Sequence, residues 1–431
     1  MSSSLYRSKV SEWQAISPRK VIQLADTMAP TIVNFRFLPA LVSARGKRRS
    51  PTIAVPPVVV LLLFALSAAL ASPPEAWCQR PVTSKDEKTS AKRPKCTERL
   101  STVDVPSAPH GLFVLLFPGA RVNEKATAHL LHNSTVCGAN VYIVWKKVDR
   151  GPGVNPRYDW SSVDEQIAPW SAAGKVVNLI VWATGYGQRA IATPDYVFSK
   201  VPSVECPSFG RVPVFWDQAF VSSYQSFMSA IVSKYGSNRS LGYIRFGLGA
   251  GGEIYPACMY ALTEHGFSKA TWRKYLFDML DYEKSLNSPK QLAVGLNAFG
   301  NPPDLQFTAE VAEHAAQNGI AIGNQGLTVQ DARNDAAGRS CMADWCRLFR
   351  RFRGKVPLVL QTGGVTHPDG SEPVGSMVEM LPFALSEHVQ IVELYVDDLL
   401  VAYDPSDPNY ARHHDEYQRV YESAAKVLGG S

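Results

Sequence analysis

The feature that most constrains this chain is an alternation of apolar segments of strand length with segments of helical periodicity, repeated eight times. The apolar segments are 111–119, 140–148, 176–183, 241–248, 292–299, 319–324, 356–361 and 389–400. The helical segments are 124–134, 160–173, 217–235, 269–286, 307–318, 344–353, 377–387 and 416–428. Near-continuous apolar strands separated by helices indicate a parallel sheet with its outer face covered by helices.

Eight such repeats predict an α/β protein with a single (β/α)8 TIM barrel over residues 108–431. An open, doubly wound sheet is the structural alternative. It is disfavoured because no Gly-x-Gly-x-x-Gly turn follows the first apolar segment, where the sequence reads Phe117-Pro-Gly-Ala.

The segment before the barrel has the pattern of a targeting signal. Residues 1–71 hold nine Lys and Arg against two acidic residues, which is a net charge of +7. The whole chain has a net charge of +6, so the other 360 residues have a net charge of −1. Basic residues 45–49 precede the 14-residue apolar run Val58–Ala71, which ends in Ala-Leu-Ala. Because a membrane span needs about 20 residues, we expect a signal peptide cleaved after Ala71. An uncleaved signal anchor over 53–71 is the alternative, and 72–107 is expected to be an extended, disordered lead-in.

Cysteine positions and charge indicate the compartment and the partners. All seven cysteines follow the apolar run, and sequons occur at Asn133 and Asn238, so we expect a secreted protein, extracellular or periplasmic. No Cys or His spacing indicates a metal, no cofactor is expected, and the near-neutral charge beyond residue 71 argues against nucleic acid. Membrane contact is expected only through an uncleaved signal segment; the oligomeric state is left open.

Two disulfides are predicted from positions in the barrel. Cys206 lies in the long segment after the third strand, and Cys258 lies in the loop after the fourth. Loops after neighbouring strands lie side by side on one face of a barrel, so these two cysteines are expected to pair. Cys341 and Cys346 form a second expected pair.

Active sites of such barrels lie at the carboxyl ends of the strands. The fourth strand leads through Gly247-Leu-Gly-Ala-Gly-Gly to Glu253, so this carboxyl group is expected at the rim, where partial burial raises a pKa as a general acid requires. Strand alternation predicts Tyr243, Arg245 and Gly247 on the barrel axis, with Arg245 paired to a buried carboxylate.

The eighth strand shows the same alternation. Val392, Leu394 and Val396 are expected to face the helices, and Glu393, Tyr395 and Asp397 to face inward. Glu393 is therefore a candidate for catalysis or substrate binding, with a structural role as the alternative.

Aromatic and amide side chains occur at the same predicted strand ends. Flat rings with polar edges suit the C–H faces of sugars, and amides suit hydroxyl groups. The aromatic candidates are Trp145, Trp182, Tyr186, Trp216, Tyr255 and Tyr395, and the amide candidates are Asn297, Asn324 and Gln325.

A resemblance follows from these motifs. The stretch from Trp216-Asp-Gln-Ala-Phe through Leu241-Gly-Tyr-Ile-Arg-Phe-Gly to Gly252-Glu253 resembles the (β/α)8 retaining glycoside hydrolases, among them family 42 β-galactosidases and family 5 cellulases. Tyr158-Asp-Trp-Ser-Ser-Val-Asp is also typical of these barrels. The resemblance implies that Glu253 is the acid/base, although Gly252 stands where the family has an Asn.

The resemblance also implies a nucleophilic Glu at the end of the seventh strand, where this chain has Gln361, which cannot be a carboxylate nucleophile. Three interpretations remain open. Glu393 is the second carboxylate, Asp369 or Glu372 acts as an inverting base, or the barrel no longer hydrolyses glycosides.

The leading functional hypothesis is therefore hydrolysis of glycosidic bonds in an extracellular or cell-wall carbohydrate. A catalytically inactive barrel that binds oligo- or polysaccharide is the alternative from another class. Another barrel hydrolase or lyase is a third, although the sequence shows no recognisable Ser/His or Cys/His pairing for it.

Overall fold

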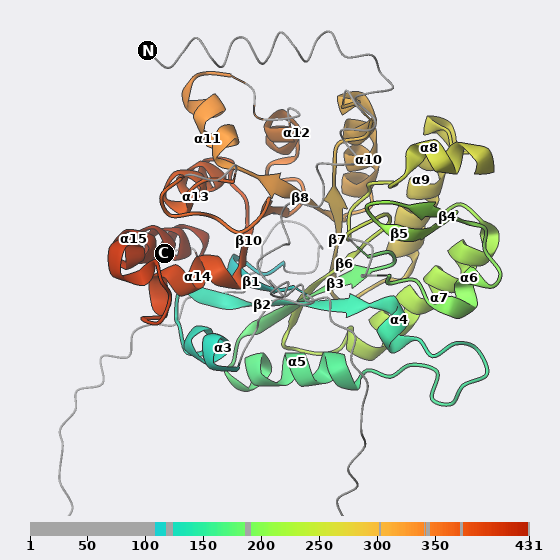
Figure 1. Ribbon diagram of the computed structural model, residues 1–431, viewed down its shortest axis with the longest axis horizontal. Coiled ribbons are helices and arrows are strands. Elements are labelled where there is room, and N and C mark those ends of the chain that lie inside the picture. Colours follow the sequence, from blue (N-terminus) through green and yellow to red (C-terminus); the bar gives the residue numbers. More distant parts are fainter. Residues whose placement is uncertain are drawn as a thin grey trace, which may run out of the picture. The chain divides into compact units, whose positions relative to one another are not determined.

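The structure is a computed structural model that describes residues 108–117, 124–185, 191–300, 303–339, 341, 345–370 and 374–429. The predicted signal segment and lead-in lie outside these residues. Eight parallel strands close into a barrel in the order β1-β10-β9-β8-β7-β6-β3-β2 (Figure 1), which confirms the predicted fold class. The strands are β1 (Gly111–Leu116), β2 (Val136–Val144), β3 (Val176–Trp182), β6 (Leu241–Phe246), β7 (Gln291–Leu296), β8 (Ala321–Leu327), β9 (Leu358–Thr362) and β10 (Ile391–Tyr395).

Helices surround the barrel and cover its outer face (Figure 1). The helices are α3 (Glu124–Leu131), α4 (Trp145–Val148), α5 (Ser161–Ala172), α6 (Asp195–Phe198), α7 (Gln218–Tyr235), α8 (Met259–Leu262), η2 (Thr263–His265), α9 (Lys269–Ser285), α10 (Leu305–Gln317), α11 (Val329–Ala336), α12 (Trp345–Phe352), α13 (Met377–Ser386), α14 (Val396–Tyr403) and α15 (Tyr410–Leu428). A short antiparallel hairpin of β4 (Ser203–Cys206) and β5 (Gly210–Pro213) interrupts the connection between β3 and α7. Among the described residues, no helix has the length and apolarity needed to cross a membrane.

The observed strand bounds differ most from the predicted ones at two places. The second strand begins at Val136 rather than at 140, and Trp145–Val148 is helical. The last strand ends at Tyr395, and the residues that follow form α14. The last strand ends early because of a helix cap. The Asp398 carboxylate accepts a hydrogen bond from the Tyr395 amide at 3.2 Å, and α14 therefore begins inside an apolar run.

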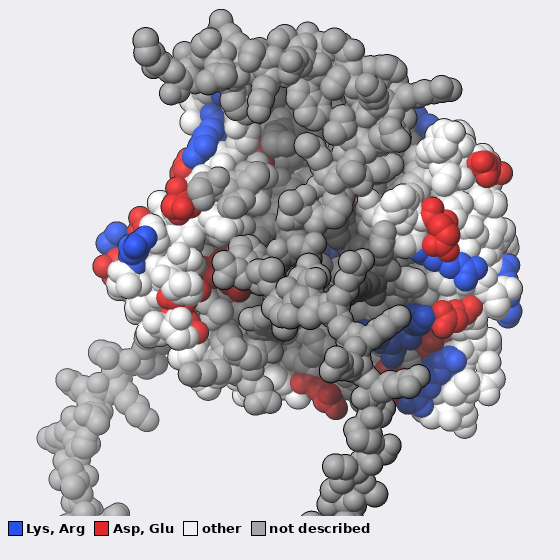
Figure 2. All heavy atoms as spheres, in the orientation of Figure 1, with Lys and Arg blue, Asp and Glu red and all other residues white. Residues whose placement is uncertain are grey.

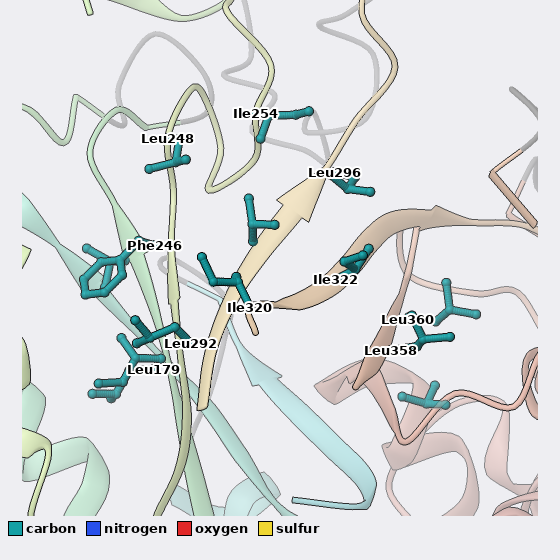
Figure 3. Close-up of a cluster of buried hydrophobic side chains, with 14 of the residues drawn as sticks. Leu179, Phe246, Leu248, Ile254, Leu292, Leu296, Ile320, Ile322, Leu358 and Leu360 are labelled. Atoms are coloured by element: carbon teal, nitrogen blue, oxygen red, sulfur yellow. The ribbon is translucent and has the colours of Figure 1, made fainter. Parts of the chain in front are cut away.

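The main core lies between the strands and the helices. Figure 3 shows part of it, with Leu179, Phe246, Ile322 and Leu358 pointing from the strands into this layer. Ile244, Phe246 and Leu248 belong to it, as the alternation of the fourth strand predicts. Full burial of each such side chain stabilises the fold by about 1.5–3 kcal/mol.

Inward side chains fill the barrel in layers. Near the strand starts, Phe113 packs with Tyr243, Val359 and Ile391 in a small apolar cluster. Two residues further along the strands, a second cluster contains Leu115, Tyr142, Ile180 and Trp182. Polar side chains lie between and beside these clusters, and they form the candidate site described below.

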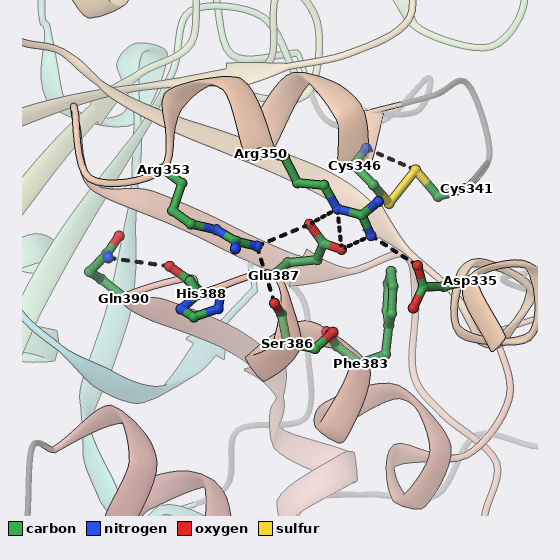
Figure 4. A network of polar contacts seen from close by, with 10 residues as sticks. All are labelled: Asp335, Cys341, Cys346, Arg350, Arg353, Phe383, Ser386, Glu387, His388 and Gln390. Carbon is green, nitrogen blue, oxygen red and sulfur yellow. Dashed lines mark hydrogen bonds and ion pairs between the residues drawn. A yellow bond between two sulfur atoms is a disulfide. The ribbon is translucent and has the colours of Figure 1, made fainter. Parts of the chain in front are cut away.

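The outer helices are joined by ion pairs. The buried Glu387, at the end of α13, accepts hydrogen bonds from Arg350 Nε at 3.1 Å, and Arg350 also pairs with Asp335 at 2.9 Å (Figure 4). The Cys341–Cys346 disulfide lies beside this network at the start of α12. Basic and acidic side chains are interspersed on the described surface seen in Figure 2.

Candidate active site

The loop after β6 is built from glycines that bring backbone segments into close contact. An added Cβ at Gly249 would lie 2.2 Å from the Tyr255 carbonyl oxygen, and Gly252 has a φ of +81°, which favours glycine. The Gly249 amide donates to the Glu253 carbonyl at 2.6 Å, and the Ile254 amide donates to the Gly295 carbonyl at 2.9 Å. The loop therefore folds back on itself and holds Glu253 against the end of β7.

Glu253 has the properties of a proton donor at neutral pH. Burial of its carboxyl group raises its pKa from 4.5 to about 7, and a hydrogen bond from Asn297 and the charge of Arg245 oppose this rise. The Asn297 amide nitrogen donates to Glu253 Oε2. A carboxyl group with a pKa near the working pH can both give and take a proton.

Arg245 and Glu393 form a buried ion pair inside the barrel. Arg245 Nη1 donates to Glu393 Oε2 at 2.9 Å, and the two side chains are 1% and 0% exposed. The Tyr243 hydroxyl donates to the other Glu393 oxygen, and Arg245 Nη2 donates to Gln361 Oε1 at 3.1 Å. Arg245 therefore has the buried carboxylate partner that the sequence predicts, and Glu393 faces inward as expected.

Aromatic rings line the barrel on the side of β1, β2, β3 and β10. The ring centroids of Tyr142 and Trp182 lie 5.2 Å apart, those of Phe117 and Trp182 lie 5.3 Å apart, and those of Phe117 and Tyr395 lie 6.3 Å apart. Burial raises the pKa of Tyr395 to about 12, so its hydroxyl stays protonated at neutral pH. Trp182 and Tyr395 were predicted from the sequence, and Phe117 and Tyr142 were missed. The period of two in the second strand places Tyr142 inward, two residues after the buried Asn140.

Other aromatic candidates lie elsewhere. Trp145 is completely buried in the main core, stacked on Phe227 with its centroid at 5.6 Å, because α4 turns it away from the barrel. Trp216 donates its indole N–H to the His265 carbonyl and packs against the helical side. Tyr255 packs on Phe209 of the β4–β5 hairpin, at 5.8 Å.

Two of the predicted polar positions, Asn324 and Asp397, do not face the barrel axis. Gln325 reaches the Gly252 carbonyl at 3.5 Å, but its neighbour Asn324 lies on the helical side and lines a small cavity with residues of α12. Adjacent strand residues point to opposite faces, so both amides cannot face the axis. Asp397 lies exposed on α14 because the strand has ended, and Asp398 is the buried residue there.

The sequence also offers Asp369 and Glu372 as candidates for an inverting base and Tyr186 as an aromatic candidate. Asp369 is an exposed residue in the turn after β9. Glu372 and Tyr186 lie outside the described residues.

The two predicted cysteine pairs are at disulfide distance, which confirms both. The Cα atoms of Cys206 and Cys258 lie 5.8 Å apart, and those of Cys341 and Cys346 lie 6.0 Å apart. The first bond fastens the β4–β5 hairpin to the loop that carries Glu253. Within the described ranges, no group of three or more His, Cys, Asp or Glu side chains is arranged to hold a metal ion.

The fold and the site together define a (β/α)8 barrel with a half-buried carboxyl group of raised pKa in the loop after its fourth strand. No protein-family model matches the sequence, and the search of curated proteins finds no match.

Among solved structures, the chain is similar to the catalytic domain of β-amylase from Paenibacillus polymyxa, with a TM-score of 0.52 and 11% identity over 73% of this chain and 98% of that one. It is also similar to xylanase 10B from Thermotoga maritima, with a TM-score of 0.46 and 10% identity over 74% and 96% of the two chains. A β-galactosidase from Bacillus circulans has a TM-score of 0.46 and 12% identity over 75% and 57%. These structural neighbours are (β/α)8 glycoside hydrolases, and the likeness to the β-amylase domain shows the barrel fold.

Proposed function

We propose that this protein hydrolyses glycosidic bonds in an extracellular or cell-wall carbohydrate, with Glu253 as the acid/base. The observation that carries the proposal is the carboxyl group of Glu253, with a pKa of about 7, at the carboxyl end of the fourth strand. In this fold, the active site lies at these strand ends. The nearby rings of Trp182 and Tyr395 are suited to the apolar faces of a sugar.

The proposed acid step transfers the Glu253 proton to the glycosidic oxygen while the bond from that oxygen to the sugar carbon breaks. Water then adds to the sugar, and its proton returns to the Glu253 carboxylate. Asn297 holds the carboxyl group in place through its amide. Gln361, Gln325 and Tyr395 are proposed substrate-binding groups because they lie on the barrel interior or beside the loop of Glu253.

Glu393 is the second carboxylate of the proposal, and its contacts favour a positioning role. Both of its oxygens are occupied, one by Tyr243 and the other by Arg245. A buried Arg that loses its carboxylate partner costs about 3–5 kcal/mol, so Glu393 fixes Arg245 inside the barrel. Arg245 in turn lowers the pKa of Glu253 against the effect of burial.

The proposed location is outside the cytoplasm. Disulfides form and persist in oxidising compartments, and two pairs of cysteines lie at bonding distance here. Cleavage after Ala71 is part of this proposal, with a signal anchor as its alternative.

The test is Glu253→Gln, measured on a panel of oligosaccharides and aryl glycosides. Turnover of the oligosaccharide is expected to fall by about 10²–10⁴-fold, and aryl glycosides with good leaving groups are expected to lose less because they need less protonation. Glu264→Gln, an exposed change in the same connection, is the matched control and should keep wild-type rates. Normal turnover by Glu253→Gln would show that another group is the acid.

A catalytically inactive carbohydrate-binding barrel is the second candidate. It is favoured by Gln361, an amide that is hydrogen-bonded to Arg245 at the end of the seventh strand. Isothermal titration separates the two candidates, since oligosaccharide binding by wild type without release of product supports the inactive barrel. For an active enzyme, NMR of the first anomer released distinguishes retention from inversion.

A further inference from the structure

Trp182 carries a buried hydrogen-bond donor that no described residue pairs with. The residue is 2% exposed at the end of β3, and its indole nitrogen has no hydrogen-bond partner among the described residues. Leaving such a donor unpaired disfavours the folded state by about 5- to 150-fold in an equilibrium constant. Buried groups of this kind in a native protein call for an explanation, and a catalytic or binding role is one of them.

The unpaired indole edge lies against the loop that carries Glu253. A Cβ atom added at Gly252 would lie 3.0 Å from Trp182 Nε1 and 3.1 Å from its Cδ1. Gly252 is the residue before Glu253, and its backbone packs directly beside the indole edge. A side chain at this position would meet both the indole and the φ of +81°, so the close approach of the loop of Glu253 to Trp182 requires glycine.

The orientation of the indole ring is fixed by its neighbours. Phe117 and Tyr142 both meet Trp182 edge to face, at interplanar angles of 76° and 72°. Ile180 lies below it on the same strand face and also reaches toward Gly252. A ring held in this way presents its N–H in one direction at little further cost in conformational entropy.

We infer that the indole N–H of Trp182 donates a hydrogen bond to a hydroxyl oxygen of the carbohydrate, on one of the two sugars joined by the bond that Glu253 protonates. Trp182 then acts as a polar specificity determinant as well as an apolar wall. This inference rests on the proposed carbohydrate site. Sites that bind a substrate hydroxyl in this way reject analogues that lack it, because the buried polar group is then left unpaired.

The experiment measures binding in the Glu253→Gln background, where the ligand is not consumed. The probes are cellotriose, xylotriose, mannotriose and maltotriose, followed by monodeoxy forms of the trisaccharide that binds best. Trp182→Phe removes the donor and keeps an aromatic ring. It is expected to weaken binding of the parent trisaccharide by about 3- to 10-fold and to leave binding of one monodeoxy form unchanged.

The matched control is Trp345→Phe. Trp345 also has a buried indole nitrogen with no hydrogen-bond partner among the described residues, but it packs against Phe349 and Phe383 in the outer core. This variant is expected to bind all the probes as its parent does. A second readout is the NMR signal of the Trp182 indole N–H, assigned by its loss in Trp182→Phe, which should move downfield when the parent trisaccharide binds and stay in place with the matching deoxy form.

The outcomes separate this inference from the proposed function. Equal weakening of every deoxy form by Trp182→Phe, or an unmoved indole signal, overturns the hydrogen bond while hydrolysis by wild type stands. Binding that depends on one hydroxyl through Trp182, with no hydrolysis by wild type, keeps the inference and overturns the enzyme. Absence of both binding and hydrolysis for all four trisaccharides overturns both.

Discussion

Replacing Asn297 by Ala is expected to shift the pH dependence of hydrolysis in a direction fixed by one hydrogen bond. Asn297 donates to Glu253 Oε2, and this bond favours the ionised carboxylate, so it holds the pKa of Glu253 down. A hydrogen bond to a charged group contributes about 1.5–3 kcal/mol, and about 1.4 kcal/mol corresponds to one pKa unit. Removing it should raise the pKa of Glu253 from about 7 to about 8–9.

The sign of the effect on activity follows from the role of the acid. As the proposed acid, Glu253 donates its proton, so activity is expected to fall as pH rises through the pKa of Glu253. In Asn297→Ala the alkaline limb of the profile should therefore move to higher pH, even if the maximum rate is lower.

The assay is kcat/KM for an oligosaccharide, measured from about pH 5 to about pH 10, because this ratio reports the pKa values of the free enzyme. Asn324→Ala is the matched control, since Asn324 is an amide at the neighbouring strand end that faces the helices. Its alkaline limb should coincide with that of wild type. An alkaline limb in Asn297→Ala that stays near pH 7, or moves to lower pH, would refute the assigned role of this hydrogen bond.

Two further predictions concern stability. Glu283 in α9 is completely buried, and neither of its carboxyl oxygens has a hydrogen-bond partner among the described residues. Burial raises its pKa well above 4.5, so this residue destabilises the fold increasingly as pH rises from about 4.5 to the folded-state pKa. Glu283→Leu should raise the free energy of unfolding by about 1–3 kcal/mol, and the gain should be larger at pH 8 than at pH 5. A lower melting temperature of the variant, or an equal gain at both pH values, would contradict this prediction. Cys206→Ala opens a disulfide whose sequence separation is 52, which corresponds to about 4 kcal/mol of loop-closure free energy. Denaturant unfolding should show a loss of that order in the free energy of unfolding. Cys258→Ala should lose the same amount, and the double variant should lose no more than either single variant. Additive losses would mean that the two cysteines act separately.

The sequence determined the barrel and the general position of Glu253, the proposed acid. Eight apolar strands that alternate with helices can bury their outer faces in few ways, and the period of two within the fourth strand placed Ile244 and Phe246 outside and Tyr243 and Arg245 inside. The glycine-rich loop after this strand also indicated that Glu253 reaches the rim. These inferences depend on local periodicity, which a single segment carries by itself.

Contacts across the barrel were decided by the tertiary structure. The pairing of Arg245 with Glu393 joins β6 to β10, and it depends on how the closed sheet staggers its strands. The hydrogen bond from Asn297 to Glu253 likewise depends on how the loop after β6 folds onto β7.

The residues at which the strands end were also decided by the tertiary structure. Asp397 was expected to face the barrel axis but lies exposed. The chain is already helical from Val396, where Asp398 caps α14, so the side chains follow the helical period of 3.6 and no longer alternate as in a strand. Trp145 leaves the barrel because α4 begins at this residue, although no side chain caps that helix. A helix cap is worth about 1 kcal/mol and is decided by the surrounding packing, so a repeating pattern of apolar residues predicts the strands more reliably than the residues at which they end.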